Sequence, residues 1–236
     1  MISNYLSLKN IFVKRGENFT LQVKRLELPE NTIAGLIGNN GAGKTTLFMT
    51  ILDLLDYKNG EITILGHKWS SGEYKIKAKI GVFLDETYVI DYLTLDEYFR
   101  FLAKAYGVDE RITLERAIEY LNILQIEYNS AQLIRKLSRG NRIKTGLIAS
   151  LLHQPDLLFW DEPFANLDPL SRQQLINLIT IIKKQQRSTF LISSHNIDEL
   201  YGFCDNFICL SSGKIALKGE KSVLSKKQIL HILGIE

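Results

Sequence analysis

A glycine-rich run that directly follows an apolar run constrains the fold more than any other feature of this chain. Residues 33 to 37 (IAGLI) have the continuous apolar character of a strand buried on both faces. Residues 38 to 46 (GNNGAGKTT) then bring three glycines, a lysine and two threonines into nine positions, before an apolar pattern resumes. This order predicts a buried strand, a tight loop and a helix over residues 43 to 55.

The spacing Gly38-x-x-x-x-Gly43-Lys44-Thr45 is the P-loop pattern, which binds nucleotide phosphates. Glycines let successive backbone N–H groups point into one concavity, and the following helix directs its N-terminal dipole there. Lys44 is predicted to bridge the outer phosphates, and the Thr45 hydroxyl to hold Mg²⁺. The predicted nucleotide-binding residues of the loop are Gly38, Asn39, Asn40, Gly41, Ala42, Gly43, Lys44, Thr45 and Thr46.

A second apolar run ends in two carboxylates. Residues 157 to 160 (LLFW) precede Asp161 and Glu162. Because α/β sheets bind ligands at the carboxyl ends of their strands, we expect both acids at such an edge. Asp161 is predicted to hold Mg²⁺ through its water shell, and Glu162 to polarise an attacking water.

Periodicity along the chain predicts an α/β fold, a P-loop core with a mostly parallel sheet. Phe19, Leu21 and Val23 alternate with polar residues, which predicts an antiparallel β subdomain at the N-terminus. Apolar residues recur at three- and four-residue steps through residues 92 to 152, which predicts a helical insertion. Residues 207 to 217 are predicted to form a hairpin that turns at Ser212-Gly213.

We therefore predict a single domain over residues 1 to 236. Its nucleotide-binding core comprises residues 1 to 86 and 153 to 236, and its helical subdomain residues 87 to 152. The strand that carries the two acids, at residues 156 to 160, and another buried strand at residues 188 to 193 are expected to flank a helix at residues 171 to 185.

Composition limits the partners. The net charge of +3, from 29 basic and 26 acidic residues, is too small to indicate nucleic acid. Cys204 and Cys209 lie in an apolar stretch and are predicted to be buried, reduced thiols. The sequence has no secretory signal pattern and no apolar run approaching the roughly 18 residues that cross a bilayer. We expect a cytosolic chain whose membrane role depends on a partner.

Three further motifs resemble those of the ATP-binding-cassette (ABC) ATPases. Residues 137 to 141 (LSRGN) resemble the family's signature motif, usually LSGGQ, and residues 164 to 169 (FANLDP) resemble its D-loop. Ser193-Ser194-His195 resembles its switch-histidine motif. With the P-loop and the acidic strand, five motifs follow the family's order over nearly the whole chain. The chain resembles the nucleotide-binding subunits of ABC transporters, of the exporter type for drugs, peptides or polysaccharides.

The resemblance implies that ATP and Mg²⁺ are the cofactors and that two subunits bind ATP head to tail. Ser138 and Gly140 of one subunit would then close on phosphates held by the P-loop of the other, and Asp168 would connect the two active sites. His195 would contact the terminal phosphate and help to hold the attacking water. The implied catalytic residues are Glu162, His195 and Lys44.

Three positions depart from the family pattern. Asp85 stands where most relatives have a glutamine that touches Mg²⁺, and we expect its carboxylate to bind Mg²⁺ directly or through water. Arg15 stands where an aromatic side chain stacks on adenine; its guanidinium plane can also stack on a base, and Phe12 is the alternative. Arg139 adds a cation to the signature motif.

The implied partners are an integral membrane permease and a second ABC ATPase subunit, either the same chain or a related one. We expect no nucleic acid, a peripheral location at the cytoplasmic face of the cell membrane, and a permease docking floor at residues 87 to 92. One alternative is a soluble ABC ATPase acting on nucleic acid or ribosomes, which the single cassette and the lack of sustained heptads disfavour. Another is a non-hydrolysing binding module, which the presence of Glu162 and His195 disfavours.

Overall fold

The computed structural model describes residues 4–69 and 74–234 and divides into two compact units. The first comprises Met1–Lys77 and Ser188–Glu236, and the second comprises Ala78–Arg187. The predicted division into a core and a helical subdomain of residues 87 to 152 uses other boundaries than these two units, and it stays a prediction.

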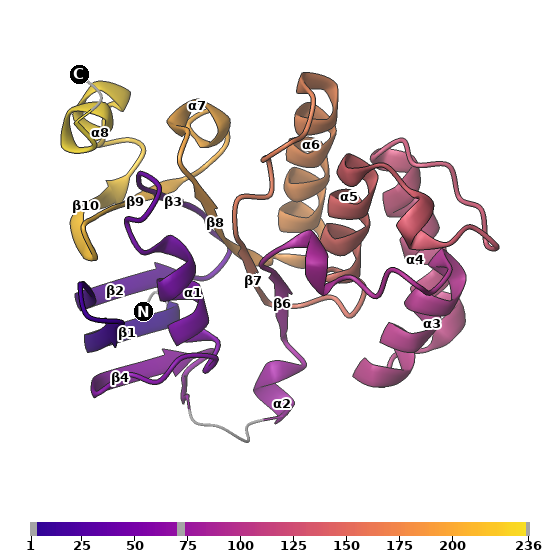
Figure 1. Ribbon diagram of the computed structural model, residues 1–236, viewed down its shortest axis with the longest axis horizontal. Helices are drawn as coiled ribbons and strands as arrows, with labels where there is room; N and C mark the ends of the chain where they lie inside the picture. The colour runs from indigo at the N-terminus through magenta and orange to yellow at the C-terminus, as the bar shows by residue number, and fades with distance from the viewer. Residues whose placement is uncertain (1–3, 70–73, 235–236) are drawn as a thin grey trace. The chain divides into compact units, whose positions relative to one another are not determined.

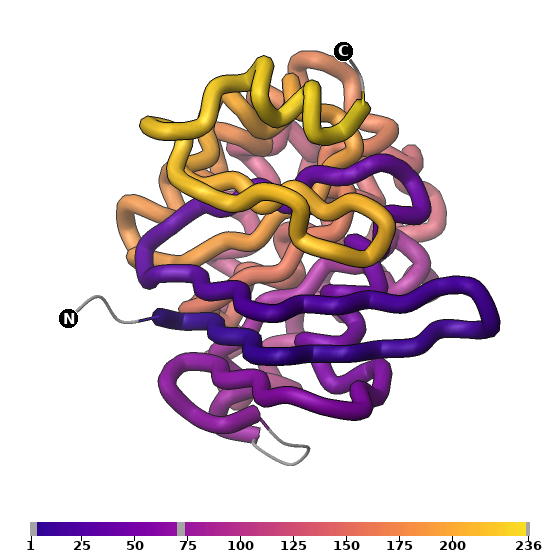
Figure 2. Tube along the Cα trace, turned by 90° about the vertical axis from the view of Figure 1, so that its left-hand side faces the viewer, coloured from indigo at the N-terminus to yellow at the C-terminus, as the bar shows by residue number. Residues whose placement is uncertain are grey.

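The first unit contains a mixed sheet with strand order β5-β4-β1-β2-β10-β9-β3-β8. Its strands are β1 (Asn4–Arg15), β2 (Phe19–Pro29), β3 (Ile33–Ile37), β4 (Asn59–Ile64), β5 (His67–Lys68), β8 (Thr189–Ser194), β9 (Asn206–Ser211) and β10 (Lys214–Glu220). Strands β1 and β2 form a long antiparallel hairpin, while β3 pairs parallel with β8 and β9. Figure 2 shows this N-terminal hairpin in indigo beside the yellow β9–β10 hairpin. The predicted antiparallel strands at the N-terminus and the parallel strands are both confirmed.

The hydrophobic pattern accounts for these strands. All five residues of β3 are buried, as expected for a central parallel strand. In β2, Leu21 and Val23 are buried and alternate with exposed neighbours. The predicted turn at Ser212-Gly213 is confirmed, and a Cβ on Gly213 would lie 1.9 Å from the carbonyl oxygen of Thr20. Only glycine can occupy that position without a shift of the backbone.

The helices of the first unit are α1 (Lys44–Ile51), α2 (Tyr74–Lys77), α7 (Ile197–Leu200) and α8 (Lys226–Ile232). Helix α1 is shorter than the predicted range of 43 to 55, because Asp53 adopts a left-handed backbone conformation (φ 60°) that cannot continue a right-handed helix. Helix α8 begins with a capping box formed by Ser225 and Gln228, and its Ile229 is fully buried.

The second unit pairs two parallel strands, β6 (Ile80–Phe83) and β7 (Leu157–Trp160), in the register Phe83↔Trp160. Its helices are the 3₁₀ turns η1 (Glu86–Tyr88) and η2 (Ile134–Lys136), and α3 (Leu95–Tyr106), α4 (Glu110–Ile123), α5 (Arg139–Ala149) and α6 (Pro169–Gln186). Figure 1 shows α3, α4, α5 and α6 beside one another.

The predicted helical stretch of residues 92 to 152 is therefore three α-helices rather than a continuous run. Gly107, with a left-handed φ of 67°, ends α3, and Asp109 caps the start of α4. Helix α5 lies tightly against β6, because a Cβ on Gly146 would come within 2.8 Å of the Phe83 ring. Trp160, fully buried at the end of β7, donates from Nε1 to the Ser150 hydroxyl at 2.9 Å.

Two expectations from composition can be compared with the structure. Cys204 and Cys209 are both buried and unbridged, as predicted. Over residues 4–69 and 74–234, none of the helices combines the length and the apolar character needed to span a bilayer.

Candidate functional site

The P-loop of the first unit joins β3 to α1 and has the geometry of a phosphate cradle. Gly41 (φ 80°) and Gly43 (φ 107°) adopt backbone conformations that L side chains rarely take. A Cβ built on Gly41 would meet no atom within 4 Å, so the loop is open at that point. Gly43 is the N-cap of α1 and has no side chain to cap the first turn, so the positive end of the helix faces the loop.

Lys44 is held across this loop. It is only 7 % exposed, and its Nζ donates to the carbonyl oxygen of Gly38 at 2.6 Å and approaches that of Asn39 at 3.4 Å. The next residue, Thr45, is exposed in the first turn of α1. A buried cation and an exposed hydroxyl at a glycine-lined helix N-terminus fit the phosphates and the Mg²⁺ of a nucleotide, because Mg²⁺ prefers oxygen ligands.

The end of β8 lies beside the start of the P-loop in the same unit. The backbone N–H of Gly38 donates to the carbonyl oxygen of Ser194 at 3.3 Å. The Ser194 hydroxyl is fixed in turn, since it donates to Glu199 at 2.7 Å and accepts the N–H of Asn196 at 2.9 Å. His195, the next residue after β8, is exposed. The predicted histidine and the predicted loop are thus neighbours.

Arg15 also belongs to this half of the site. It is the last residue of β1, and its Nη1 donates to the Thr46 hydroxyl at 3.2 Å. This contact places the guanidinium beside the first turns of α1. Phe12, the alternative base-stacking residue, is half-buried within β1.

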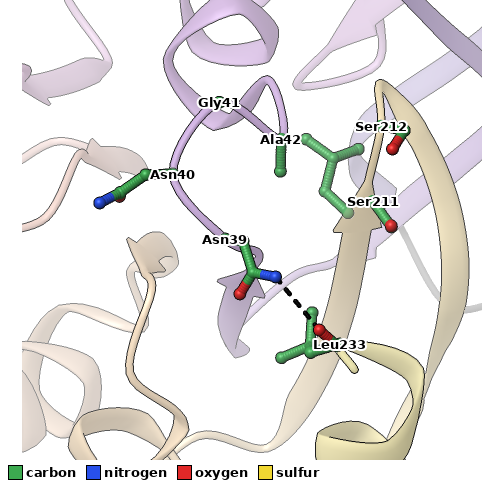
Figure 3. Close-up of a pocket in the computed structure, with 8 residues that line it drawn as sticks. Asn39, Asn40, Gly41, Ala42, Ser211, Ser212 and Leu233 are labelled. Atoms are coloured by element: carbon green, nitrogen blue, oxygen red, sulfur yellow. Dashed lines mark hydrogen bonds between the residues drawn. The ribbon is translucent and has the colours of Figure 1, made fainter. Parts of the chain in front are cut away.

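A pocket of about 150 Å³ lies against the P-loop (Figure 3). It is lined by Asn39, Asn40, Gly41, Ala42, Leu210, Ser211, Ser212 and Leu233. Asn39 Nδ2 donates to the carbonyl oxygen of Leu233 at 3.1 Å (Figure 3). The Asn40 side chain points away from Leu233. One P-loop side chain is therefore held by Leu233, the residue that follows α8.

The second unit carries the acidic residues. Its two paired strands end side by side, because Phe83 pairs with Trp160 and the Asp161 N–H donates to the Phe83 carbonyl oxygen at 2.8 Å. Asp161 is buried, at 6 % exposure, and Glu162 is half-buried with a left-handed φ of 48°. A non-glycine residue in that conformation is strained, and such strain is concentrated at functional positions.

Asp85 follows β6 in the same way that Glu162 follows β7, two residues beyond the Phe83–Trp160 pair. Its carboxylate also has a local role, since Oδ1 accepts the N–H of Thr87 at 2.8 Å and caps η1. A carboxylate has further lone pairs, so this capping bond is compatible with the predicted contact to Mg²⁺.

The signature residues stand at the start of α5. Ser138 is the N-cap, and its Oγ accepts the N–H of Asn141 at 3.2 Å. Ser138 is exposed, whereas Gly140 is half-buried. Gly140 lies near Leu167 of the D-loop segment, because a Cβ built on Gly140 would be 3.8 Å from the Cδ2 atom of Leu167. The second unit thus brings the signature turn close to the segment before Asp168.

Asp168 is the exposed N-cap of α6. Its carboxylate accepts the Ser171 hydroxyl at 2.6 Å and the Ser171 N–H at 3.0 Å. Both bonds lower the pKa of the Asp168 carboxyl below its ordinary value, and the bond from the Ser171 hydroxyl has the larger effect. The sequence analysis assigned no role to the contacts of Ser171 with Asp168 or of Ser194 with Glu199, although an aspartate directly before a helix is a recognisable capping signal.

The comparisons with known proteins agree with this geometry. A family model described as "ABC transporter" matches residues 21–165. The chain belongs to the ABC transporter family. The resemblance and the fold inferred from the motifs are thereby confirmed.

Among its relatives in the ABC transporter family, the ATP-binding protein YhaQ of Bacillus subtilis is 33 % identical over 195 residues, which cover 83 % of this chain. The bacitracin transport ATP-binding protein BcrA of Bacillus licheniformis is 30 % identical over 200 residues, which cover 85 % of this chain. The chain spans 64 % of the length of each of these two relatives. A solved ATP-binding subunit of an ABC transporter superposes with a TM-score of 0.86 at 25 % identity, over 98 % of this chain and 99 % of that one.

Proposed function

We propose that this chain binds and hydrolyses ATP with Mg²⁺ and thereby drives a separate membrane permease, in the direction of export. The observation that carries the proposal is the P-loop, in which the buried Lys44 amine is held across a glycine-lined, open helix N-terminus. The names of YhaQ and BcrA favour a transport subunit over an ATPase acting on nucleic acid or ribosomes.

In the first unit, the backbone N–H groups of residues 38 to 46 would hold the phosphates, and Lys44 would exchange its bond to Gly38 for the outer phosphate oxygens. Thr45 would supply a hydroxyl ligand to Mg²⁺. His195 would contact the terminal phosphate, and Arg15 would stack on the base.

In the second unit, Asp161 and Asp85 would supply oxygen ligands, directly or through water, to Mg²⁺, which neutralises charge on the phosphate oxygens. Glu162 would accept a proton from the attacking water, as a general base does. Its half-buried position and its left-handed backbone support that role, because backbone strain is concentrated at functional positions.

Ser138, Gly140 and Asp168 are proposed to act on the nucleotide of a second ABC subunit, arranged head to tail. The exposed Ser138 stands at the N-terminus of α5, an element whose dipole favours anions. A P-loop surrounds the phosphates from one side, so a second anion site is useful where it closes over the other side. The second subunit would be another copy of this chain or a related one.

The permease is proposed to dock on residues 87 to 92. Tyr88 and Tyr92 are 67 % and 69 % exposed, and large exposed aromatic side chains are the residues that anchor protein interfaces. Docking there would hold the chain at the cytoplasmic face of the membrane. Export is favoured by the resemblance of the segment around Asp85 to efflux subunits.

The test is phosphate release by the purified chain in ATP and Mg²⁺. Wild type should release phosphate, and Glu162→Gln should lose at least about 100-fold in rate, which is the range of a general base. The same variant should form an ATP-dependent dimer in size-exclusion chromatography with light scattering. Glu127→Gln, at an exposed position of the same unit, is the matched control and should behave as wild type. A wild type without Mg²⁺-dependent phosphate release would overturn the proposal.

A further inference from the structure

One ion pair in the second unit joins Arg139, a position at which the sequence departs from the family pattern, to Glu86, the residue after the departing Asp85. Arg139, the first residue of α5, donates from Nε to the Glu86 carboxylate at 2.5 Å. The two residues are 53 positions apart in the sequence. The Glu86 side chain is 15 % exposed and that of Arg139 is 57 % exposed, so the acid is fixed within the fold and the arginine reaches over to it.

This ion pair connects two turns, one at the start of η1 and one at the start of α5. Glu86 begins η1, which the Asp85 carboxylate caps through the Thr87 N–H. Arg139 directly follows Ser138, which caps α5. Farther along α5, Gly146 lies against Phe83 and Val89 so closely that a Cβ would come within 2.8 Å and 3.0 Å of them. Helix α5 thus contacts the segment 83–89 at two points, at Gly146 and at its first residue.

Electrostatics explains why the second attachment matters. A cation in the first turn of a helix opposes the helix dipole, so an unpaired Arg139 would destabilise the turn that carries Ser138 and Gly140. Glu86 supplies the negative charge that compensates for it. The contact at Gly146 lies about two turns farther along α5, whereas the ion pair holds its N-terminal end directly to the Asp85 turn.

We propose that Arg139 and Glu86 are positioning residues, whose ion pair holds the Ser138 turn of α5 in a fixed orientation to the Asp85 turn. The consequence for hydrolysis rests on the proposed function, in which these two turns serve phosphate and Mg²⁺. The pair itself does not depend on that function. Neither residue is in the P-loop, so loss of the pair is expected to lower kcat and to leave the KM for ATP nearly unchanged.

Charge reversal gives the sharpest experiment. Arg139→Glu and Glu86→Arg each place like charges together, and the double variant restores an ion pair with its signs exchanged. Hydrogen exchange, measured without nucleotide on peptides covering residues 84–90 and 137–145, should be faster in both single variants and near wild type in the double variant. In ATP and Mg²⁺, the single variants should lose roughly fivefold in kcat and the double variant should recover most of it.

The exposed Arg111–Glu115 pair of α4, which spans 2.9 Å, is the matched control. Its reversed single variants should change neither measurement. If the double variant exchanges as fast as the single variants, the positioning role is wrong. If Glu86→Arg keeps full kcat while Arg139→Glu does not, Arg139 acts on phosphate directly and the proposal is also overturned. A wild type that hydrolyses no ATP would refute the proposed function, while the exchange measurement would still decide the role of the pair.

Discussion

The Nζ atom of Lys44 donates a hydrogen bond to the carbonyl oxygen of Gly38, 2.6 Å away, across the loop that joins β3 to α1. The buried amine thus lies inside a loop of backbone N–H groups and beside a helix N-terminus. All three features favour anions.

Replacing this lysine should therefore weaken nucleotide binding and leave the fold intact. We expect Lys44→Ala to weaken ATP binding about 10- to 100-fold, the range of one or two charge-assisted hydrogen bonds. Isothermal titration calorimetry measures the change. Lys14→Ala, at an exposed position of β1, is the control and should bind as wild type. Unchanged affinity in Lys44→Ala would contradict the phosphate role of the loop.

The first glycine of the P-loop is required by packing. A Cβ on Gly38 would lie 2.5 Å from the carbonyl oxygen of Leu210, which belongs to the backbone of β9 and cannot rotate away. Gly38→Ala should lower the free energy of unfolding by about 1–3 kcal/mol. Gly202→Ala places its Cβ in open space and should cost much less. Thermal denaturation of both variants measures the difference, and equal midpoints would show that the strand and the loop are not this close.

His153 gives the second unit a predictable response to acid. Its ring stacks on that of Tyr106, with centroids 3.8 Å apart and planes 1° apart, and its Nε2 lies 3.0 Å from the Ile80 carbonyl oxygen. Burial lowers the pKa of the imidazole from 6.5 to about 4. Between these values the unfolded chain takes up a proton that the folded chain does not.

Stability supported by His153 is therefore fully present above pH 6.5 and is lost as the pH falls towards 4, by up to about 3 kcal/mol. His153→Phe keeps a ring against Tyr106 and removes the titrating group. Urea unfolding at a series of pH values should give a flatter profile for this variant between pH 6.5 and 4. The exposed His67→Gln is the control, and an equally steep profile in His153→Phe would exclude the imidazole as the cause.

The two exposed tyrosines of the segment 87–92 test the proposed permease contact. The double variant Tyr88→Ala/Tyr92→Ala should reduce recovery of the chain with its membrane partner by about 10-fold or more, because exposed aromatic anchors dominate interfaces. Phosphate release by the isolated chain should not change. Tyr74→Ala, which removes a side chain that is 80 % exposed, should have no effect on recovery. Equal recovery of the double variant would place the permease contact elsewhere.

Local patterns predicted much of the fold and of the candidate site. The P-loop, the buried strands and the turn at Ser212-Gly213 follow from glycine spacing and apolar periodicity, which act within a few residues. The end of α1 was misplaced, because the left-handed backbone of Asp53 has no strong sequence signal. The contacts Arg139–Glu86 and Asn39–Leu233 join residues 53 and 194 positions apart, and such pairings depend on the folded chain rather than on any local pattern.

Mixing two inactive variants tests the head-to-tail arrangement most directly. Lys44→Ala removes the P-loop cation, and Ser138→Arg blocks the signature turn. In a head-to-tail dimer of the two variants, one site carries both changes and the other carries neither. The mixture should therefore recover about a quarter of wild-type phosphate release, if sites act independently, whereas each variant alone has almost none. A mixture as inactive as its components would contradict the arrangement in which Ser138 of one subunit serves the nucleotide of the other.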